Sequence, residues 1–445
     1  MQTKLTEGNI TKNIFSFALP ILLGVCFQRL YVLADTIIVG RLLGKNLLAA
    51  VGSASVIANL FIDLCISFTN GFSIVIAQFY GENNNQKTKL SLASTYLISL
   101  FLLIFLTLLG LLLINPLLNL TKTPQEIFDF AYQYASIMIG GLFCSLIYNL
   151  LANVLRALGD SIIPLIFLII SVCLNVILDY TLIRFTPLQI KGAALATVIS
   201  QGVSGLLCLI FCYLKRPIIH VKKEHFKINI FIYKKIISQG FATALMLSVV
   251  TLSTLILQTG INSLGTDMIA GYLAGRKYLE LFMMPGLALS MTAASFVSQN
   301  YGAKKYERIK EGVKKLIQIG CTWAFICFII LFIFSRPIVI SVTGKNVEQH
   351  IIDCGVLYLK TGVLFFCFLF ILVITRSSLQ GMNHKKTPVI SSCIELLVKC
   401  IAVFVLVPHF SFFGICITEP LIWLINSLWL FPMYLKYLKK DWVNN

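Results

Sequence analysis

The chain has 445 residues, of which 58% are hydrophobic and 12% are charged, and its mean hydropathy is +0.88. Soluble globular proteins carry about twice that proportion of charged residues, so a water-soluble fold is excluded. Because about 20 apolar residues span a bilayer, the chain has room for about a dozen spans and none for a large extramembrane domain. The composition therefore predicts an all-α integral membrane protein.

Polar, Gly and Pro residues divide the sequence into twelve apolar windows, which we predict to be transmembrane helices. They lie near residues 14–39, 50–77, 92–114, 131–155, 162–183 and 192–214, and then near 236–261, 269–298, 316–334, 355–380, 388–408 and 413–435. The segment between the two sets carries seven Lys and Arg residues against a single Glu. We predict an N-terminal lobe over residues 1–214, a basic linker over 215–235 and a C-terminal lobe over 236–445.

The net charge of +18 is explained by membrane topology. When the N-terminus is placed in the cytoplasm, most of the 36 Lys and Arg residues fall in cytoplasmic segments, as the positive-inside rule requires. Both termini and the linker are therefore expected in the cytoplasm. The linker is expected to attract anionic membrane lipids, and no nucleic-acid partner is expected.

Short stretches of the first half recur in the second half at a nearly constant offset. Gln78–Gly81 is echoed by Gln299–Gly302, Leu155–Gly159 with Pro164 aligns with Leu379–Asn383 with Pro388, and Gly192 aligns with Gly414. Ordered islands of this kind indicate an internal repeat. Because each repeat has six spans, the two lobes share one orientation and are related by a pseudo-two-fold axis along the membrane normal. Substrate is expected to bind between the lobes.

Ionisable residues inside a span are costly, so each is a functional candidate. Asp35 in the first span and Asp179 in the fifth have no basic residue three or four positions away. Asn175 stands one turn before Asp179, and Thr197 in the sixth span adds a hydroxyl. Such an oxygen-rich group suits a proton or a small hard cation, whereas the alternative is a set of polar contacts between helices.

Other charged residues have a structural explanation. Glu395 precedes Lys399 by four positions, the favourable order for an ion pair on one helical face. Glu280 follows Arg276 by four positions, and the same interpretation applies. Pro20 weakens the first span and produces either a static kink or a hinge. The sequence leaves the roles of Arg29, Glu280 and Glu419 open.

Signatures of enzymes are absent from the sequence. It contains no two-His zinc pattern, no Gly-rich phosphate loop and no Ser elbow. The 13 Cys residues lack metal-ligand spacing and sit mostly in apolar runs, so we expect neither disulfides nor a metal centre. We predict a protein that is not an enzyme and uses no cofactor.

Several stretches together resemble the multidrug and toxic compound extrusion (MATE) family. They are Leu30, Tyr31 and the run Ala34–Arg41 in the first span, Gln299–Ala303 after the eighth, and Leu155–Asp160 with Pro164 after the fourth. The resemblance covers nearly the whole chain. It implies two six-helix lobes around a cavity that opens alternately to each face, and export of cationic or amphiphilic compounds in exchange for protons or sodium ions.

The resemblance also assigns site residues. The family's coupling site in the N-terminal lobe maps onto Asp35, Asn175, Asp179 and Thr197, which makes these four the only candidate ligands for a sodium ion. Pro20 matches a Pro at which some members bend the first span. The family's second cation site is not reproduced, because the seventh and tenth spans contain no Asp or Glu; Glu280 or Glu419 would have to substitute.

The predicted function is therefore multidrug efflux by cation-coupled antiport, carried out by a monomer in the inner membrane of a bacterium. Phe27, Gln28 and Tyr31 are candidates for the substrate cavity. The alternative is a flippase of lipid-linked oligosaccharide or another lipid-like substrate from the same superfamily. Such flippases usually have a more basic cavity and two extra spans, and neither is evident here.

Overall fold

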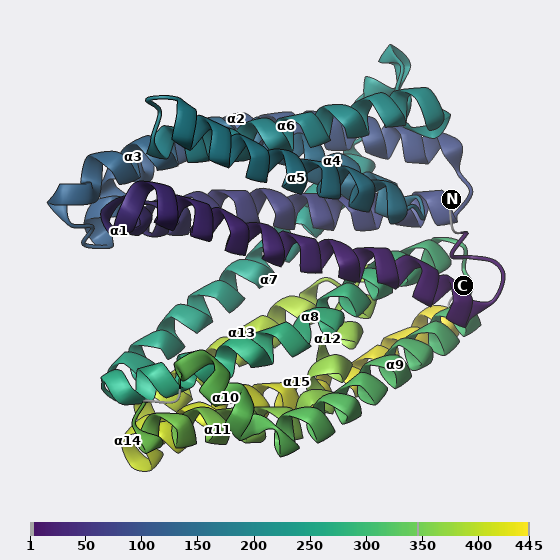
Figure 1. Cartoon of the computed structure of the whole chain (residues 1–445). Coiled ribbons are helices and arrows are strands. Elements are labelled where there is room, and N and C mark those ends of the chain that lie inside the picture. Colours follow the sequence, from purple (N-terminus) through teal and green to yellow (C-terminus); the bar gives the residue numbers. More distant parts are fainter. Residues whose placement is uncertain (1–3, 345–346, 444–445) are drawn as a thin grey trace. The chain divides into compact units, whose positions relative to one another are not determined.

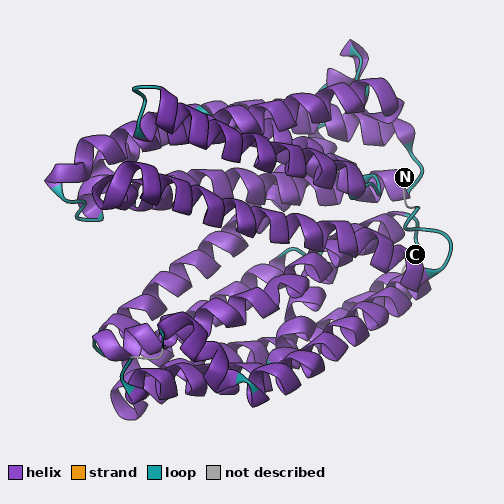
Figure 2. Cartoon of the chain, viewed as in Figure 1, coloured by secondary structure: helices purple, strands orange, loops and turns teal. Residues whose placement is uncertain are grey.

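The computed structural model describes residues 4–344 and 347–443, and over these residues it contains helices and loops but no strand (Figure 2). The remaining residues, 1–3, 345–346 and 444–445, include the outer ends of both predicted lobes and lie outside the described part. The all-α fold predicted from composition is confirmed.

The helices follow the chain in the order labelled in Figure 1. The first half contains α1 (Ile10–Gly81), α2 (Asn85–Leu120), α3 (Gln125–Gly140), α4 (Leu142–Ala157), α5 (Ile162–Phe185) and α6 (Ile190–Lys215), followed by the short 3-10 helices Pro217–Ile219 and Lys223–Phe226. The second half contains α7 (Ile230–Asn262), α8 (Thr266–Gly302), α9 (Tyr306–Ile333), α10 (Ser335–Thr343), α11 (Gln349–Leu364), α12 (Phe366–Gly381), α13 (Lys386–Ile401), a π-helical segment Ala402–Leu406, α14 (Val407–Phe410) and α15 (Phe412–Val443).

The twelve predicted spans are confirmed, although their boundaries differ from the ends of the helices. In the described chain nine helices are long and apolar enough to cross a membrane, and two bent pairs, α3 with α4 and α11 with α12, add one span each. The bends measure 43° and 54°. The long helix α1 supplies two spans, because its backbone leaves the helical conformation at Gly44, where φ is 80°. A residue without a Cβ tolerates that conformation.

Close packing between helices depends on small residues, as in other membrane proteins. A Cβ added at Gly271 of α8 would lie 2.7 Å from the Ile351 carbonyl oxygen of α11, and one at Gly275 would lie 2.9 Å from the Gly355 carbonyl oxygen. These distances are too short for any larger residue. The backbones of α8 and α11 therefore approach each other because both contribute glycine at the crossing.

The helices form two compact units, which differ from the predicted lobes at two places. Unit 1 contains Leu19–Ala244, and unit 2 contains Lys4–Ala18 together with the described residues from Leu245 onward. The first part of α1 thus packs with unit 2, and the first part of α7 packs with unit 1. In unit 1, a Cβ added at Gly71 of α1 would lie 2.6 Å from Gly240 Cα of α7, which explains why the start of α7 stays with α1.

The segment before α1 is bound to unit 2 by basic side chains at the junction of α8 and α9. The Arg308 guanidinium donates to the carbonyl oxygens of Leu5, Glu7 and Gly8 at 3.1, 2.7 and 2.8 Å. Lys305 Nζ donates to the Thr6 carbonyl oxygen at 2.9 Å, and the Leu5 side chain is fully buried. This segment, Lys4–Gly8, is therefore an integral part of unit 2, and we call it the N-terminal anchor.

Replacing Arg308 should release the N-terminal anchor. Arg308→Ala removes three charge-assisted hydrogen bonds to backbone oxygens, each of which contributes about 1.5 kcal/mol or more when fully formed. We expect trypsin to cut after Lys4 and Lys12 at least about fivefold faster than in the wild type. Lys310→Ala, an exposed charge on the same helix, is the matched control. Equal cleavage rates in the two variants would show that Arg308 does not hold the N-terminal anchor in place.

Candidate functional site

The four residues predicted to bind a cation come together within unit 1. Asp35 lies on α1, Asn175 and Asp179 lie one turn apart on α5, and Thr197 lies on α6, which packs along α5. The Asn175 and Asp179 side chains are fully buried, Thr197 is buried, and Asp35 is half-buried. A local sequence pattern placed Asn175 and Asp179 on one face of their helix, and the fold brings the other two residues to that face.

The Thr197 hydroxyl connects the three helices. Asn175 Nδ2 donates to Thr197 Oγ1 at 3.4 Å, and Tyr31 Oη of α1 lies 2.9 Å from the same oxygen. Asp35 and Asp179 lie close enough for their charges to interact. Tyr31, which the sequence placed among the substrate-cavity candidates, is thus a direct partner of the site.

Tyr134 of α3 is a further residue at this site, and sequence reasoning missed it. Its side chain is buried and interacts electrostatically with both Asp35 and Asp179. Nothing in the sequence near Tyr134 marks it out, because it approaches the carboxylates only through the packing of α3. We call the six residues Tyr31, Asp35, Tyr134, Asn175, Asp179 and Thr197 the carboxylate cluster.

Several oxygens of the carboxylate cluster lack a well-formed hydrogen bond in the described protein. Both oxygens of Asp179, Oδ1 of Asp35 and Oδ1 of Asn175 are buried and make no hydrogen bond of ordinary geometry, although Asp179 lies close enough to Asp35 and Asn175 to interact with both side chains. A buried polar atom without a partner is costly, and two neighbouring carboxylates cannot both stay charged cheaply. Protons or a small hard cation would remove both costs, and such cations prefer oxygen ligands. The described residues contain no group of three or more His, Cys, Asp or Glu side chains that could hold a metal ion.

The other first-span candidates lie on α1 near the carboxylate cluster. Phe27 is half-buried, whereas Gln28 and Arg29 are exposed. Pro20 lies inside α1 without interrupting it, and the helix packs closely beside it, since a Cβ at Gly24 would lie 3.5 Å from Leu168 of α5.

Unit 2 contains a buried charge network that is larger than the pair seen in the sequence. Lys399 Nζ lies 3.0 Å from Glu395 Oε1, as the spacing predicted, and 3.3 Å from Glu419 Oε1 on α15. Arg376 of α12 lies 3.4 Å from Glu395 Oε2. The Lys399 and Glu395 side chains are only 2% and 8% exposed. Spacing along one helix revealed the first contact, whereas the contacts between helices depend on the fold.

The second predicted pair, Arg276 and Glu280 on α8, has a different environment. Arg276 Nε lies 2.7 Å from Glu280 Oε1, and the guanidinium also bonds the Tyr272 hydroxyl. The side chains are 32% and 42% exposed, so this contact contributes little to stability compared with a buried pair.

The Glu395–Lys399 and Arg276–Glu280 ion pairs differ in burial, so the same substitution in each tests how much burial adds to the contribution of an ion pair to stability. Glu395→Gln leaves Arg376 and Lys399 with one buried carboxylate fewer, which should destabilise the protein by about 3 kcal/mol. Glu280→Gln should cost less than about 1 kcal/mol. Thermal unfolding in detergent measures both, and similar losses in the two variants would contradict the burial argument.

Comparison with known proteins identifies the family. The sequence matches the MatE family over residues 20–181 and 242–405. It is 26% identical to the "Probable multidrug resistance protein YoeA" of Bacillus subtilis over 75% of this chain and 74% of that protein, and 26% identical to the "Probable multidrug resistance protein NorM" of Thermotoga maritima over 90% and 87%. A crystal structure of MATE in the bent conformation shares the fold, with a TM-score of 0.91, 22% identity and 99% of each chain covered. This chain belongs to the MATE family of membrane transporters.

Proposed function

We propose that this protein exports cationic or amphiphilic compounds from a bacterial cell in exchange for protons or sodium ions. It acts as a monomer in the inner membrane, with membrane lipids as its surroundings and both termini and the basic linker in the cytoplasm. It is not an enzyme and needs no cofactor. Relatives that carry names of multidrug resistance proteins support the substrate class.

The observation that carries the coupling proposal is the set of unpartnered oxygens in the carboxylate cluster. Asp35 and Asp179 repel each other when both are charged, and a bound cation removes the repulsion. A coupling ion drives transport only if its affinity differs between the two conformations. The cluster provides such a difference if the separation of α1 and α5 changes during transport, because Asp35 and Asp179 lie on different helices.

Residues of the carboxylate cluster have different roles in the proposed coupling. Asp35 and Asp179 hold the proton, or supply the charge that a sodium ion requires, while the oxygens of Asn175 and Thr197 are further sodium ligands. Tyr31 joins α1 to α6 through the Thr197 hydroxyl, so the position of α1 responds to the occupancy of the cluster. Pro20 is the weak point at which α1 bends in response.

Organic substrate binds near the same part of α1. Phe27 and Tyr31 are four positions apart and both half-buried, so they present aromatic surface on one helical face. Aromatic rings bind flat organic cations through cation–π contacts. Gln28 beside them offers a polar contact.

Neutralising Asp35 should uncouple transport. In proteoliposomes with a proton or sodium gradient imposed separately, we expect Asp35→Asn to lower gradient-driven ethidium movement to about a tenth of the wild-type rate or less, because one lost buried charge contact is worth more than about 1.4 kcal/mol. Asp63→Asn, the same substitution at an exposed position of α1, should transport normally. Normal ethidium movement by Asp35→Asn would refute coupling at the cluster.

A second substitution distinguishes the two ions. Thr197→Val removes a sodium ligand but keeps both carboxylates, so it should weaken sodium-driven transport strongly and proton-driven transport only slightly. Tyr31→Phe removes the same hydrogen bond while leaving the Thr197 oxygen in place. It should therefore lower transport equally under both gradients, which shows how much of any loss comes from that hydrogen bond alone. Equal loss under both gradients in Thr197→Val would show that the hydroxyl is not an ion ligand.

A further inference from the structure

The two halves of the repeat place an ion pair at the same point but with opposite polarity. In unit 1, Asp160 follows α4 and pairs with Arg216, the residue after α6. In unit 2, His384 follows α12 and pairs with Asp441 in the last turn of α15, with His384 Nε2 2.7 Å from Asp441 Oδ2. His384 lies 224 positions after Asp160, and Asp441 lies 225 positions after Arg216. The acid Asp160 thus aligns with the base His384, and the end of the last helix of each half supplies the partner of opposite charge, with Asp441 about one turn beyond the position that aligns with Arg216.

Both pairs fasten the end of the last helix of a repeat, α6 or α15, to an earlier turn of the same repeat. Asp160 is fully buried, and its Oδ1 also accepts the Ile163 amide at 3.2 Å, which fixes the turn into α5. The His384 and Asp441 side chains are 23% and 13% exposed. The His384–Asp441 contact is therefore mostly buried, but water still reaches part of both side chains and can exchange protons with the imidazole.

The surroundings of His384 come from three helices and its own turn. The imidazole stacks on the Tyr437 ring of α15, with centroids 4.0 Å apart. The Tyr301 hydroxyl at the end of α8 donates to the same Asp441 oxygen at 3.2 Å, and Tyr306 of α9 interacts electrostatically with Asp441. Lys385 and Lys386 follow His384 in the sequence.

The chemical difference between the two pairs lies in their bases. Arginine stays protonated at every accessible pH, so the Asp160–Arg216 pair keeps its strength. Histidine changes charge between about pH 5 and 8. A neutral imidazole N–H still donates to the charged Asp441 carboxylate, but a protonated imidazole adds the attraction of opposite charges. The His384–Asp441 contact is therefore stronger at low pH than at higher pH.

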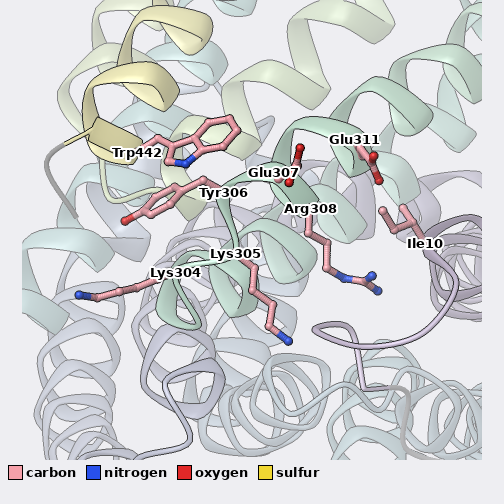
Figure 3. A pocket seen from close by; sticks show the side chains of 8 residues that line it. All are labelled: Ile10, Lys304, Lys305, Tyr306, Glu307, Arg308, Glu311 and Trp442. Atoms are coloured by element: carbon pink, nitrogen blue, oxygen red, sulfur yellow. The ribbon is translucent and has the colours of Figure 1, made fainter.

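We propose that His384 and Asp441 form a pH-sensitive latch that holds the end of α15 at low pH and releases it at higher pH. Trp442 follows Asp441 and lines a pocket of about 470 Å³ together with Lys304, Lys305 and Arg308 (Figure 3). Release of the latch therefore frees one wall of that pocket. If the protein admits protons as proposed above, their accumulation at the face that carries the C-terminus tightens the latch; this last consequence alone depends on the proposed function.

Hydrogen exchange of the purified full chain tests the latch without a transport assay. After correction for the intrinsic effect of pH, we expect amides of residues 435–443 to exchange about two- to fivefold faster at about pH 8 than at about pH 5.5, the range expected for a partly exposed ion pair. The end of α6, residues 208–215, should show no such change. An unchanged rate at the end of α15 would overturn the proposal.

Two variants show whether His384 is the titrating group. His384→Lys supplies a permanent cation and should keep the end of α15 protected at both pH values. The double variant H384D/D441R copies the arrangement of unit 1 and should do the same, so one variant decides if the other does not fold. A pH dependence that persists in either variant would overturn the proposal. Asp35→Asn should leave the latch intact, which separates this outcome from a failure of the proposed function.

Discussion

A carboxylate inside a membrane protein needs a cation or a proton nearby, because little water reaches it and the charged form is costly. The two units meet this requirement differently. In unit 2, Glu395 lies between Lys399 and Arg376, so its charge is balanced by the protein itself. In unit 1, Asp179 has no cationic partner among the residues that the structure places around it, and neither of its oxygens makes a hydrogen bond of ordinary geometry. In the proposed mechanism, unit 1 takes its balancing charge from a bound proton or cation, whereas the network of unit 2 is balanced by its own side chains.

This contrast separates charges that the protein balances internally from charges that it leaves unbalanced. A balanced network costs free energy to assemble but, once formed, has no reason to exchange its partners. An unbalanced pair of acids gains free energy whenever a cation arrives. The distinction agrees with the departure seen in the sequence, where the acids expected for a second cation site are absent from the seventh and tenth spans.

Hydrophobic windows predicted the spans well because each span must satisfy its backbone internally and face lipid with apolar side chains. They did not predict the bend between α3 and α4, which occurs at Gly141, where a Cβ would lie 2.3 Å from Val198. Nor did they predict the short helix α10. Both features depend on contacts with other helices, which hydropathy does not encode.

The candidate site, like the fold, was predictable from the sequence mainly where neighbouring residues share one helix. Spacing along one helix identified Asn175 with Asp179 and Glu395 with Lys399. The polar character of Asp35 and Thr197 within their spans suggested that they join the first pair, and the family resemblance strengthened that grouping. Tyr134 had no signal in the sequence. Arg376 stands out as a charge within a predicted span, but nothing in the sequence connects it to Glu395. Their roles come from packing alone, since no fixed spacing connects them to the residues they contact.

The exchange of helix segments between the units limits how the chain can be divided. A cut in the basic linker would give two fragments, and each would lack a piece of its own unit. The N-terminal fragment would carry the anchor, whose carbonyl oxygens bind Arg308 in the other fragment, and the C-terminal fragment would carry Gly240, which packs on Gly71. Although the halves derive from a repeat, they are therefore complementary rather than interchangeable, and neither fragment holds a complete core of its own.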